Sequence, residues 1–204
     1  LDKDFYLRIA TELNLKKCMV GGIDRVYEIG RIFRNEGIDT RHNPEFTTIE
    51  LYQAYGDLGS MKSWVEGLFD SLCKKLGKTT FHWMGNDIDF SKGFRWVSMA
   101  EAIQEKTGID FTKQMTFEEA VALAKEHNVP LQKSWNSVGY IMNAFFDEFV
   151  EKSLIQPTFI HTYPVEVSPL TKRSKDPRFV ERFEFFIGGT EMGNAYSELN
   201  NPFD

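Results

Sequence analysis

Cysteine, low-complexity sequence and long apolar runs are scarce or missing here, and each absence excludes a class of protein. Two cysteines in 204 residues, with no CxxC pair, argue against both a disulfide framework and a zinc site. No stretch approaches the ~20 apolar residues of a membrane span, and the start shows no basic-then-apolar signal peptide. We therefore expect a cytoplasmic protein with no membrane partner.

The composition that is present suits a folded domain. A hydrophobic content of 42%, with 14% aromatic residues, allows one domain with an elaboration or two small domains. Thirty acidic residues against 24 basic ones give a net charge of −6. This balance argues against the segment gripping a nucleic-acid backbone by bulk electrostatics alone.

Hydrophobic periodicity predicts an α+β fold, a partial antiparallel sheet that a helical insertion interrupts. A short helix is expected near residues 11–19, followed by two paired strands at 26–33 and 46–55. Further strands are expected at 158–167 and 182–187. We predict three regions: a first core part with the strand pair, a mainly helical insertion, and a second core part, at residues 1–57, 58–155 and 156–204.

Four helix signals lie inside the predicted insertion. Ser60 is a plausible N-cap for an amphipathic run, and Ser98 with Glu101 has the spacing of a capping box. Thr116 with Glu119 repeats that spacing. A fourth helix is expected from Val138, where apolar residues recur at intervals of three and four.

The stretch RIFRNEGIDTRHNPEFTTIELYQAY carries unusual chemistry for a hairpin. Strand alternation places Phe46, Glu50 and Tyr52 on one face, as expected of a floor that binds something; an ordinary solvated face is the alternative. Arg34 ends the preceding strand, where its guanidinium can form a fixed fork toward phosphate. A lone arginine usually makes a surface ion pair, but Glu36, Arg41 and His42 follow closely and favour an anion-handling site.

The segment GGTEMGNAYSELN places Glu191 and Glu198 seven residues apart. Paired carboxylates suggest a hard cation such as magnesium, although solvated acids at a strand edge are the alternative. Residues seven apart on a regular strand face opposite ways, so convergence requires a bulge, a turn or a helical segment.

These segments resemble a known family. RIFRNEGIDTRHNPEFTTIELYQAY is similar to motif 2 of the class II lysyl-tRNA synthetases of bacterial type, and four further segments resemble other active-site segments of that family: YLRIATELNLKK, PTFIHTYPVEVSPLTK, RFEFFIGG and EMGNAYSELNNP. The resemblance covers essentially the whole chain in the family's order. Aspartyl and asparaginyl relatives share part of motif 2, but RNEG, HNPEFT and the later SPL-T-K favour the lysine branch.

The resemblance implies a role for each candidate residue. Arg34 would bind the ATP α-phosphate and act in catalysis, and Phe46 would stack on adenine. Glu36, His42 and Asn43 would orient the nucleotide. Glu191 and Glu198 would bind Mg²⁺. The lysine substrate would be held by Glu12 near its α-amino group, by Glu50 and Tyr52 at its side-chain ammonium, and by Asn200.

The implied activity is that of a lysine–tRNA ligase, which uses L-lysine, ATP and tRNA(Lys) and whose parent protein is a homodimer. The chain shows no motif 1 and no motif 3, so we expect a catalytic-domain fragment that is inactive alone. Two alternatives remain: a paralogue that attaches a lysine-like group to a protein, and a non-catalytic binding or regulatory module.

Overall fold

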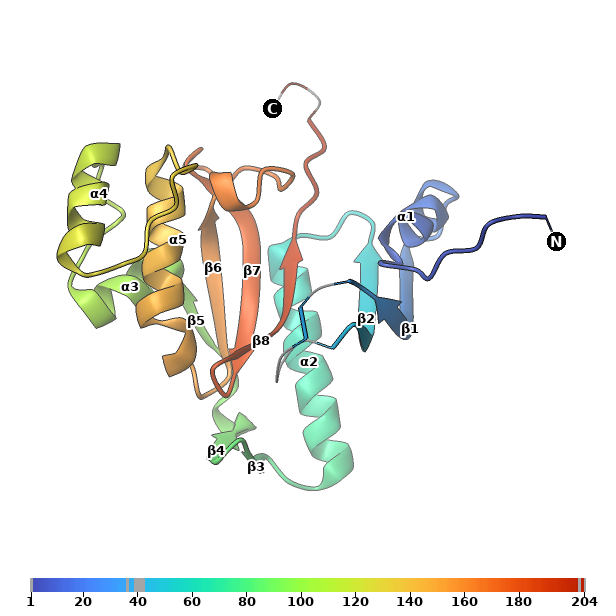
Figure 1. Cartoon of the computed structure of the whole chain (residues 1–204). Coiled ribbons are helices and arrows are strands. Elements are labelled where there is room, and N and C mark those ends of the chain that lie inside the picture. The colour runs from blue at the N-terminus through green and yellow to red at the C-terminus, as the bar shows by residue number, and fades with distance from the viewer. Residues whose placement is uncertain (1, 36, 39–42, 202, 204) are drawn as a thin grey trace. The chain divides into compact units, whose positions relative to one another are not determined.

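The computed structural model describes residues 2–35, 37–38, 43–201 and 203. The chain divides into two compact units, residues 1–56 (unit 1) and residues 57–204 (unit 2), which Figure 1 colours from blue to cyan and from cyan to red. In the described part of the chain, no helix has both the length and the apolar character needed to cross a membrane.

The described residues of unit 1 form one helix and one hairpin. Helix α1 (Glu12–Val20) precedes the antiparallel strands β1 (Arg25–Phe33) and β2 (Glu45–Gln53). The predicted strand pairing is therefore confirmed. Strand β2 ends two residues earlier than predicted, because the chain turns at Ala54 and Tyr55 and Tyr55 adopts φ 57°.

Unit 2 is built around a sheet with strand order β5-β6-β7-β8. Strand β5 pairs with β6 in parallel, and the other two pairings are antiparallel. A separate small hairpin joins β3 and β4. The bounds are β3 (Thr80–Trp83), β4 (Asn86–Asp89), β5 (Arg95–Ser98), β6 (Thr158–Pro164), β7 (Phe179–Ile187) and β8 (Thr190–Tyr196).

Four α-helices belong to unit 2: α2 (Leu58–Leu76), α3 (Met99–Thr107), α4 (Phe117–Glu126) and α5 (Val138–Phe149). The predicted capping boxes are present at the starts of α3 and α4. The N-cap predicted at Ser60 is wrong, because Asp57 caps α2 and Ser60 completes the box as its third residue.

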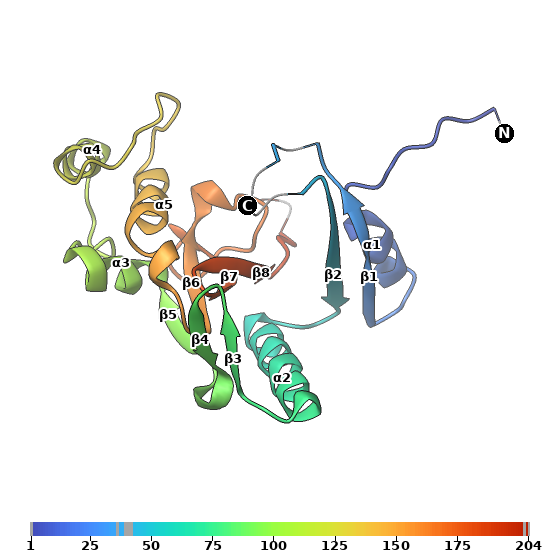
Figure 2. The same ribbon diagram turned by 60° about the horizontal axis from the view of Figure 1, so that its bottom comes forward.

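The helices cover both faces of this sheet, as Figures 1 and 2 show. On one face, Val65 of α2 packs with Phe159 and Phe183. On the other face, α3 and α5 pack against Ile160 and Phe186. Alternation along β6 and β7 explains this division, since Phe159 and Phe183 point one way while Ile160 and Phe186 point the other. The observed α+β class matches the prediction.

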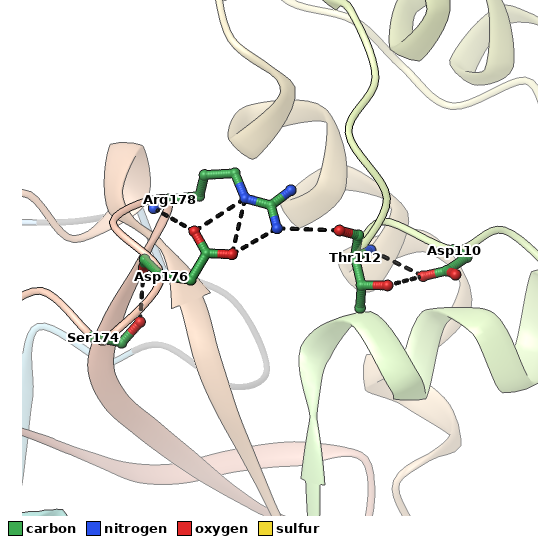
Figure 3. Close-up of polar contacts among 5 residues, drawn as sticks. All are labelled: Asp110, Thr112, Ser174, Asp176 and Arg178. Atoms are coloured by element: carbon green, nitrogen blue, oxygen red, sulfur yellow. Dashed lines mark hydrogen bonds and ion pairs between the residues drawn. The ribbon is translucent and has the colours of Figure 1, made fainter.

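A polar clamp joins the loop before β7 to the loop after α3. Arg178 donates hydrogen bonds to both carboxylate oxygens of Asp176, and its Nη2 donates to the carbonyl of Thr112 at 3.1 Å (Figure 3). Ser174 Oγ donates to the Asp176 carbonyl at 2.8 Å. The chain that enters β7 is thereby fixed to the helical layer.

Candidate functional site

An acidic face lies on the hairpin of unit 1. The register sets Glu28 directly opposite Glu50, so both carboxylates project from the same face. Glu28 pairs with the Arg8 guanidinium, which occupies the space where a side chain at Gly30 would begin. Glu50 instead accepts hydrogen bonds from two hydroxyls, from Thr11 Oγ1 at 2.7 Å and from the Tyr52 hydroxyl at 2.5 Å.

Thr11, one of the two donors to Glu50, lies at the start of a helix. It is the N-cap residue of α1 and is 2% exposed, yet its side chain makes no capping hydrogen bond. Its hydroxyl donates to Glu50 instead. Because both donors to Glu50 are uncharged hydroxyls, they orient the carboxylate without neutralising its charge. Such a carboxylate can receive an ammonium group.

Arg34 and Phe46 are neighbours at the loop end of the hairpin, where β1 ends and β2 begins. The Arg34 guanidinium carbon lies 5.6 Å from the centroid of the Phe46 ring, and Arg34 Nε donates to the Ile9 carbonyl at 3.1 Å. Asn43 Oδ1 accepts from the Glu45 backbone N–H at 3.4 Å. The predicted nucleotide residues Glu36 and His42 lie outside the described residues.

Glu12 starts α1, as predicted, and its side chain pairs with Lys16 one turn later at 2.6 Å. The Lys16 ammonium also lies 5.6 Å from the centre of the Tyr52 ring. Glu12 and Tyr52 therefore border the same lysine side chain within unit 1.

A polar cavity of about 290 Å³ lies in unit 2, between α5 and the sheet. The cavity is polar because four carboxylates and one guanidinium line it. Its lining consists of Asn143, Phe146, Asp147, Glu151, Tyr163, Val167, Arg182, Glu184, Phe186 and Glu191.

Two β-bulges aim side chains into this cavity. The pairing of β8 with β7 shifts by one residue at Met192, so that Glu191 faces Phe186 while Asn194 faces Glu184. Because of the extra residue, Glu191 and Asn194 project from the same face of β8 although they are three residues apart. A bulge is one of the features that convergence of Glu191 and Glu198 would require, and their convergence stays a prediction.

The second bulge lies in the pairing of β6 with β7, where Thr162 of β6 is opposite Glu181 and Arg182 of β7. Thr162 has φ 64°, a left-handed conformation that is rare for a β-branched residue, and the pairing with β7 shifts between His161 and Tyr163. The shift returns Tyr163 to the face of Ile160. From there its hydroxyl donates to Glu184 Oε2 at 2.8 Å.

Charges in the cavity perturb one another. Arg182 Nη2 donates to Glu184 Oε1 at 2.5 Å, yet burial, with repulsion from Glu191, raises the pKa of Glu184 above its ordinary value. Burial beside Glu184 raises the pKa of Tyr163, so its hydroxyl stays a proton donor. Burial and the nearby Glu151 raise the pKa of Asp147 to about 6.

The remaining predicted residues follow β8. Glu198 forms an isolated backbone bridge with Thr171, and Asn200 lies exposed two residues later. Glu198 is not among the residues that line the cavity, whereas Glu184 is. Within the described ranges, no group of three or more histidine, cysteine, aspartate or glutamate side chains is arranged to hold a metal ion.

Several residues that the structure brings to these sites were not predicted from the sequence. Arg8, Thr11 and Glu28 join the face of Glu50, and Arg182 and Glu184 join the cavity with Glu191. A signal existed for the last pair, since RFEFF alternates charged and aromatic residues along one strand.

Comparison with known proteins identifies the family. The model of the family "tRNA synthetases class II (D, K and N)" matches residues 1–204. The chain belongs to this class II synthetase family. The antiparallel hairpin and the mixed sheet with its helices are accordingly parts of a class II synthetase domain.

Curated relatives of this class II synthetase chain are lysine–tRNA ligases. The chain is 56% identical over 205 residues to that of Streptococcus agalactiae, covering 100% of this chain and 41% of the relative. It is 52% identical over 206 residues to that of Lactococcus lactis subsp. cremoris, covering 100% and 42%. It is 55% identical over 203 residues to that of Streptococcus thermophilus, covering 98% and 41%. The chain thus spans about two-fifths of the length of these relatives.

Proposed function

We propose that this chain is the part of a lysine–tRNA ligase that binds lysine and ATP. The observation that carries the proposal is the environment of Glu50, whose carboxylate is oriented by two neutral hydroxyls beside a second carboxylate that Arg8 already balances. A charge held in this way suits the ammonium group of a lysine side chain. The identity of 52–56% to lysine–tRNA ligases along the whole chain supports the same substrate.

The resemblance to the family supports the following roles for residues of unit 1 and for Asn200 of unit 2. Glu50 and Tyr52 receive the side-chain ammonium, and Glu12 lies near the α-amino group. Arg34 holds the α-phosphate while Phe46 stacks on adenine, and Glu36, His42 and Asn43 complete the nucleotide site. Asn200 contacts the amino acid. Activation then needs no covalent nucleophile from the protein, because a lysine carboxylate oxygen attacks the α-phosphorus and the bond to pyrophosphate breaks.

Positioning and charge stabilisation are the protein's contribution to this step. The guanidinium of Arg34 offsets negative charge that develops at the α-phosphate. In the second step, a hydroxyl of the terminal ribose of tRNA(Lys) attacks the carbonyl of lysyl-adenylate and releases AMP. We further propose that the parent protein is a cytoplasmic homodimer and that the chain alone is inactive.

Magnesium fits the carboxylates of unit 2. A Mg²⁺ ion usually takes one or two carboxylates together with waters and substrate phosphates, so the small group around Glu191 is sufficient. Glu191 would hold the ion together with Glu198 or with Glu184, which lines the same cavity. When bound, the ion would offset charge on the triphosphate.

Charging of tRNA tests the proposal. A full-length protein that contains this chain should esterify tRNA(Lys) with lysine in the presence of Mg·ATP. Transfer of lysine to a protein instead of tRNA would replace the proposal with the paralogue function. Lysine binding with neither transfer would indicate a binding module.

A further inference from the structure

The loop between β6 and β7 contains a short segment, residues 168–172 with the sequence SPLTK, which we call the strap. Two of its hydroxyl side chains are buried: Ser168 is 7% exposed and Thr171 is 2% exposed. Their oxygens lie 2.7 Å apart and form a hydrogen bond. Burying a hydroxyl group without a hydrogen-bond partner costs free energy, so the two hydroxyls are expected to keep this mutual arrangement.

The backbone of the strap holds the chain around Glu198. Thr171 bridges Glu198, and the Leu199 N–H donates to the Leu170 carbonyl at 3.3 Å. The Lys172 N–H donates to the Ser197 carbonyl at 3.0 Å. The strap is therefore the neighbouring strand for the residues that continue β8.

The side chains of the strap reach Glu184 through Arg182. Ser168 Oγ accepts a hydrogen bond from Arg182 Nη1 at 3.1 Å, and Arg182 Nη2 donates to Glu184 at 2.5 Å. The Arg182 guanidinium also lies 5.2 Å from the centre of the Tyr163 ring, and the Tyr163 hydroxyl donates to the other oxygen of Glu184. Both oxygens of Glu184 thus accept a hydrogen bond, and the one from Arg182 connects Glu184 to the strap.

We infer that Ser168 and Thr171 are positioning residues that set the relative placement of Glu184 and Glu198. The Glu184 carboxylate is held through the Ser168–Arg182 hydrogen bond, and the backbone of Glu198 is held by its bridge to Thr171. The Ser168–Thr171 hydrogen bond couples the two. This inference rests on the proposed function, since it assigns the strap to the carboxylates beside Glu191.

Loss of a partner that orients a ligand of this kind typically lowers metal affinity or activity by about tenfold to a hundredfold. Thr171→Val removes the hydroxyl and keeps the branched shape, while Ser168→Ala removes the acceptor for Arg182. Each should raise the Mg²⁺ concentration for half-maximal lysine activation by about tenfold or more. Lysine and ATP should still bind, because their proposed contacts lie in unit 1 except for Asn200, and none of these residues is substituted.

The test uses a full-length protein that contains this chain. Lysine-dependent ATP–pyrophosphate exchange is measured across a Mg²⁺ titration, and Mn²⁺ binding in the presence of ATP is measured separately by electron paramagnetic resonance. Thr171→Ser should restore the hydroxyl and recover most of the lost Mn²⁺ affinity. Ser174→Ala is the matched control, because its hydroxyl donates only to the Asp176 carbonyl in the adjacent loop (Figure 3).

The outcomes separate this inference from the proposed function. If the wild-type protein shows no exchange with lysine, the proposed function fails, whereas Mn²⁺ binding still reports on the strap. Weaker Mn²⁺ binding in Thr171→Val, rescued in Thr171→Ser and unchanged in Ser174→Ala, is the expected result. Equal Mn²⁺ affinity in the wild type, Ser168→Ala and Thr171→Val would overturn the positioning role. An equal loss in Ser174→Ala would overturn it too, because the effect would then be general loop destabilisation.

Discussion

Replacing Glu50 by glutamine separates the charge of this side chain from its shape. In the wild-type protein, each Glu50 oxygen accepts one hydroxyl hydrogen bond, from Thr11 at 2.7 Å and from Tyr52 at 2.5 Å. Glutamine keeps one oxygen acceptor, and its amide group can donate to a hydroxyl that rotates. The packing should therefore survive while the charge is lost.

The size of the effect follows from the interaction that is removed. A hydrogen bond to a charged group contributes about 1.5–3 kcal/mol, and 1.4 kcal/mol is a factor of ten. We therefore expect kcat/KM for lysine to fall by about tenfold to 150-fold in Glu50→Gln. The KM for ATP should change by less than about threefold, because Arg34 and Phe46 are untouched.

The assay is lysine-dependent ATP–pyrophosphate exchange with each substrate varied in turn. Glu45→Gln is the matched control, because Glu45 lies on the same strand but on the opposite face, paired with Arg31. An equal rise in the KM values for lysine and ATP, or an equal loss in Glu45→Gln, would refute the assignment of Glu50 to the ammonium group.

Three further predictions concern catalysis, pH and packing. Arg34→Ala should lower the rate of adenylate formation by about 10²–10³ with the melting temperature retained; a near-wild-type rate in a single-turnover assay would remove Arg34 from this role. Because the pKa of Asp147 is raised to about 6 in the folded protein, its ionisation destabilises the fold increasingly as pH rises from about 4 through 6. Asp147→Asn should consequently stabilise the protein at pH 8 by up to ~1 kcal/mol after solvent screening, as measured by urea unfolding, and should not stabilise it at pH 4. Equal effects at both pH values, or an equal gain in the exposed Glu148→Gln, would contradict this prediction. Phe159→Ala, at a ring that is 0% exposed, should destabilise unit 2 by about 3–5 kcal/mol in the same assay, whereas Phe5→Ala, at a ring that is 76% exposed, should change stability by less than ~0.5 kcal/mol.

Local patterns were sufficient for the hairpin and for most helices. Alternation placed Phe46, Glu50 and Tyr52 on one face, and the register of β1 with β2 confirms it. The predicted capping boxes at Ser98 and Thr116 are also confirmed. The residues of each box lie within four positions of one another, so the prediction depends on no distant contact.

Features that arise from strand pairing could not be predicted in this way. The bulge opposite Thr162 and the bulge at Met192 exist only in the pairing of β6 and β8 with β7, and no local sequence pattern marks either one. Glu184 was missed because the charged residues of its strand do not show which distant carboxylate they will meet, and only the pairing with β8 places Glu184 near Glu191. The hairpin of β3 and β4 was also missed, since each strand has four residues and β4 is mostly polar.

We propose that the residues of the candidate site serve the activation of lysine. The most direct measurement is ATP–pyrophosphate exchange by a full-length protein that contains this chain, with lysine compared against arginine, ornithine and aspartate. We expect Mg²⁺-dependent exchange with lysine and none above background with the other three amino acids. Exchange that depends on another amino acid, or no exchange in a folded protein that binds ATP, would contradict it.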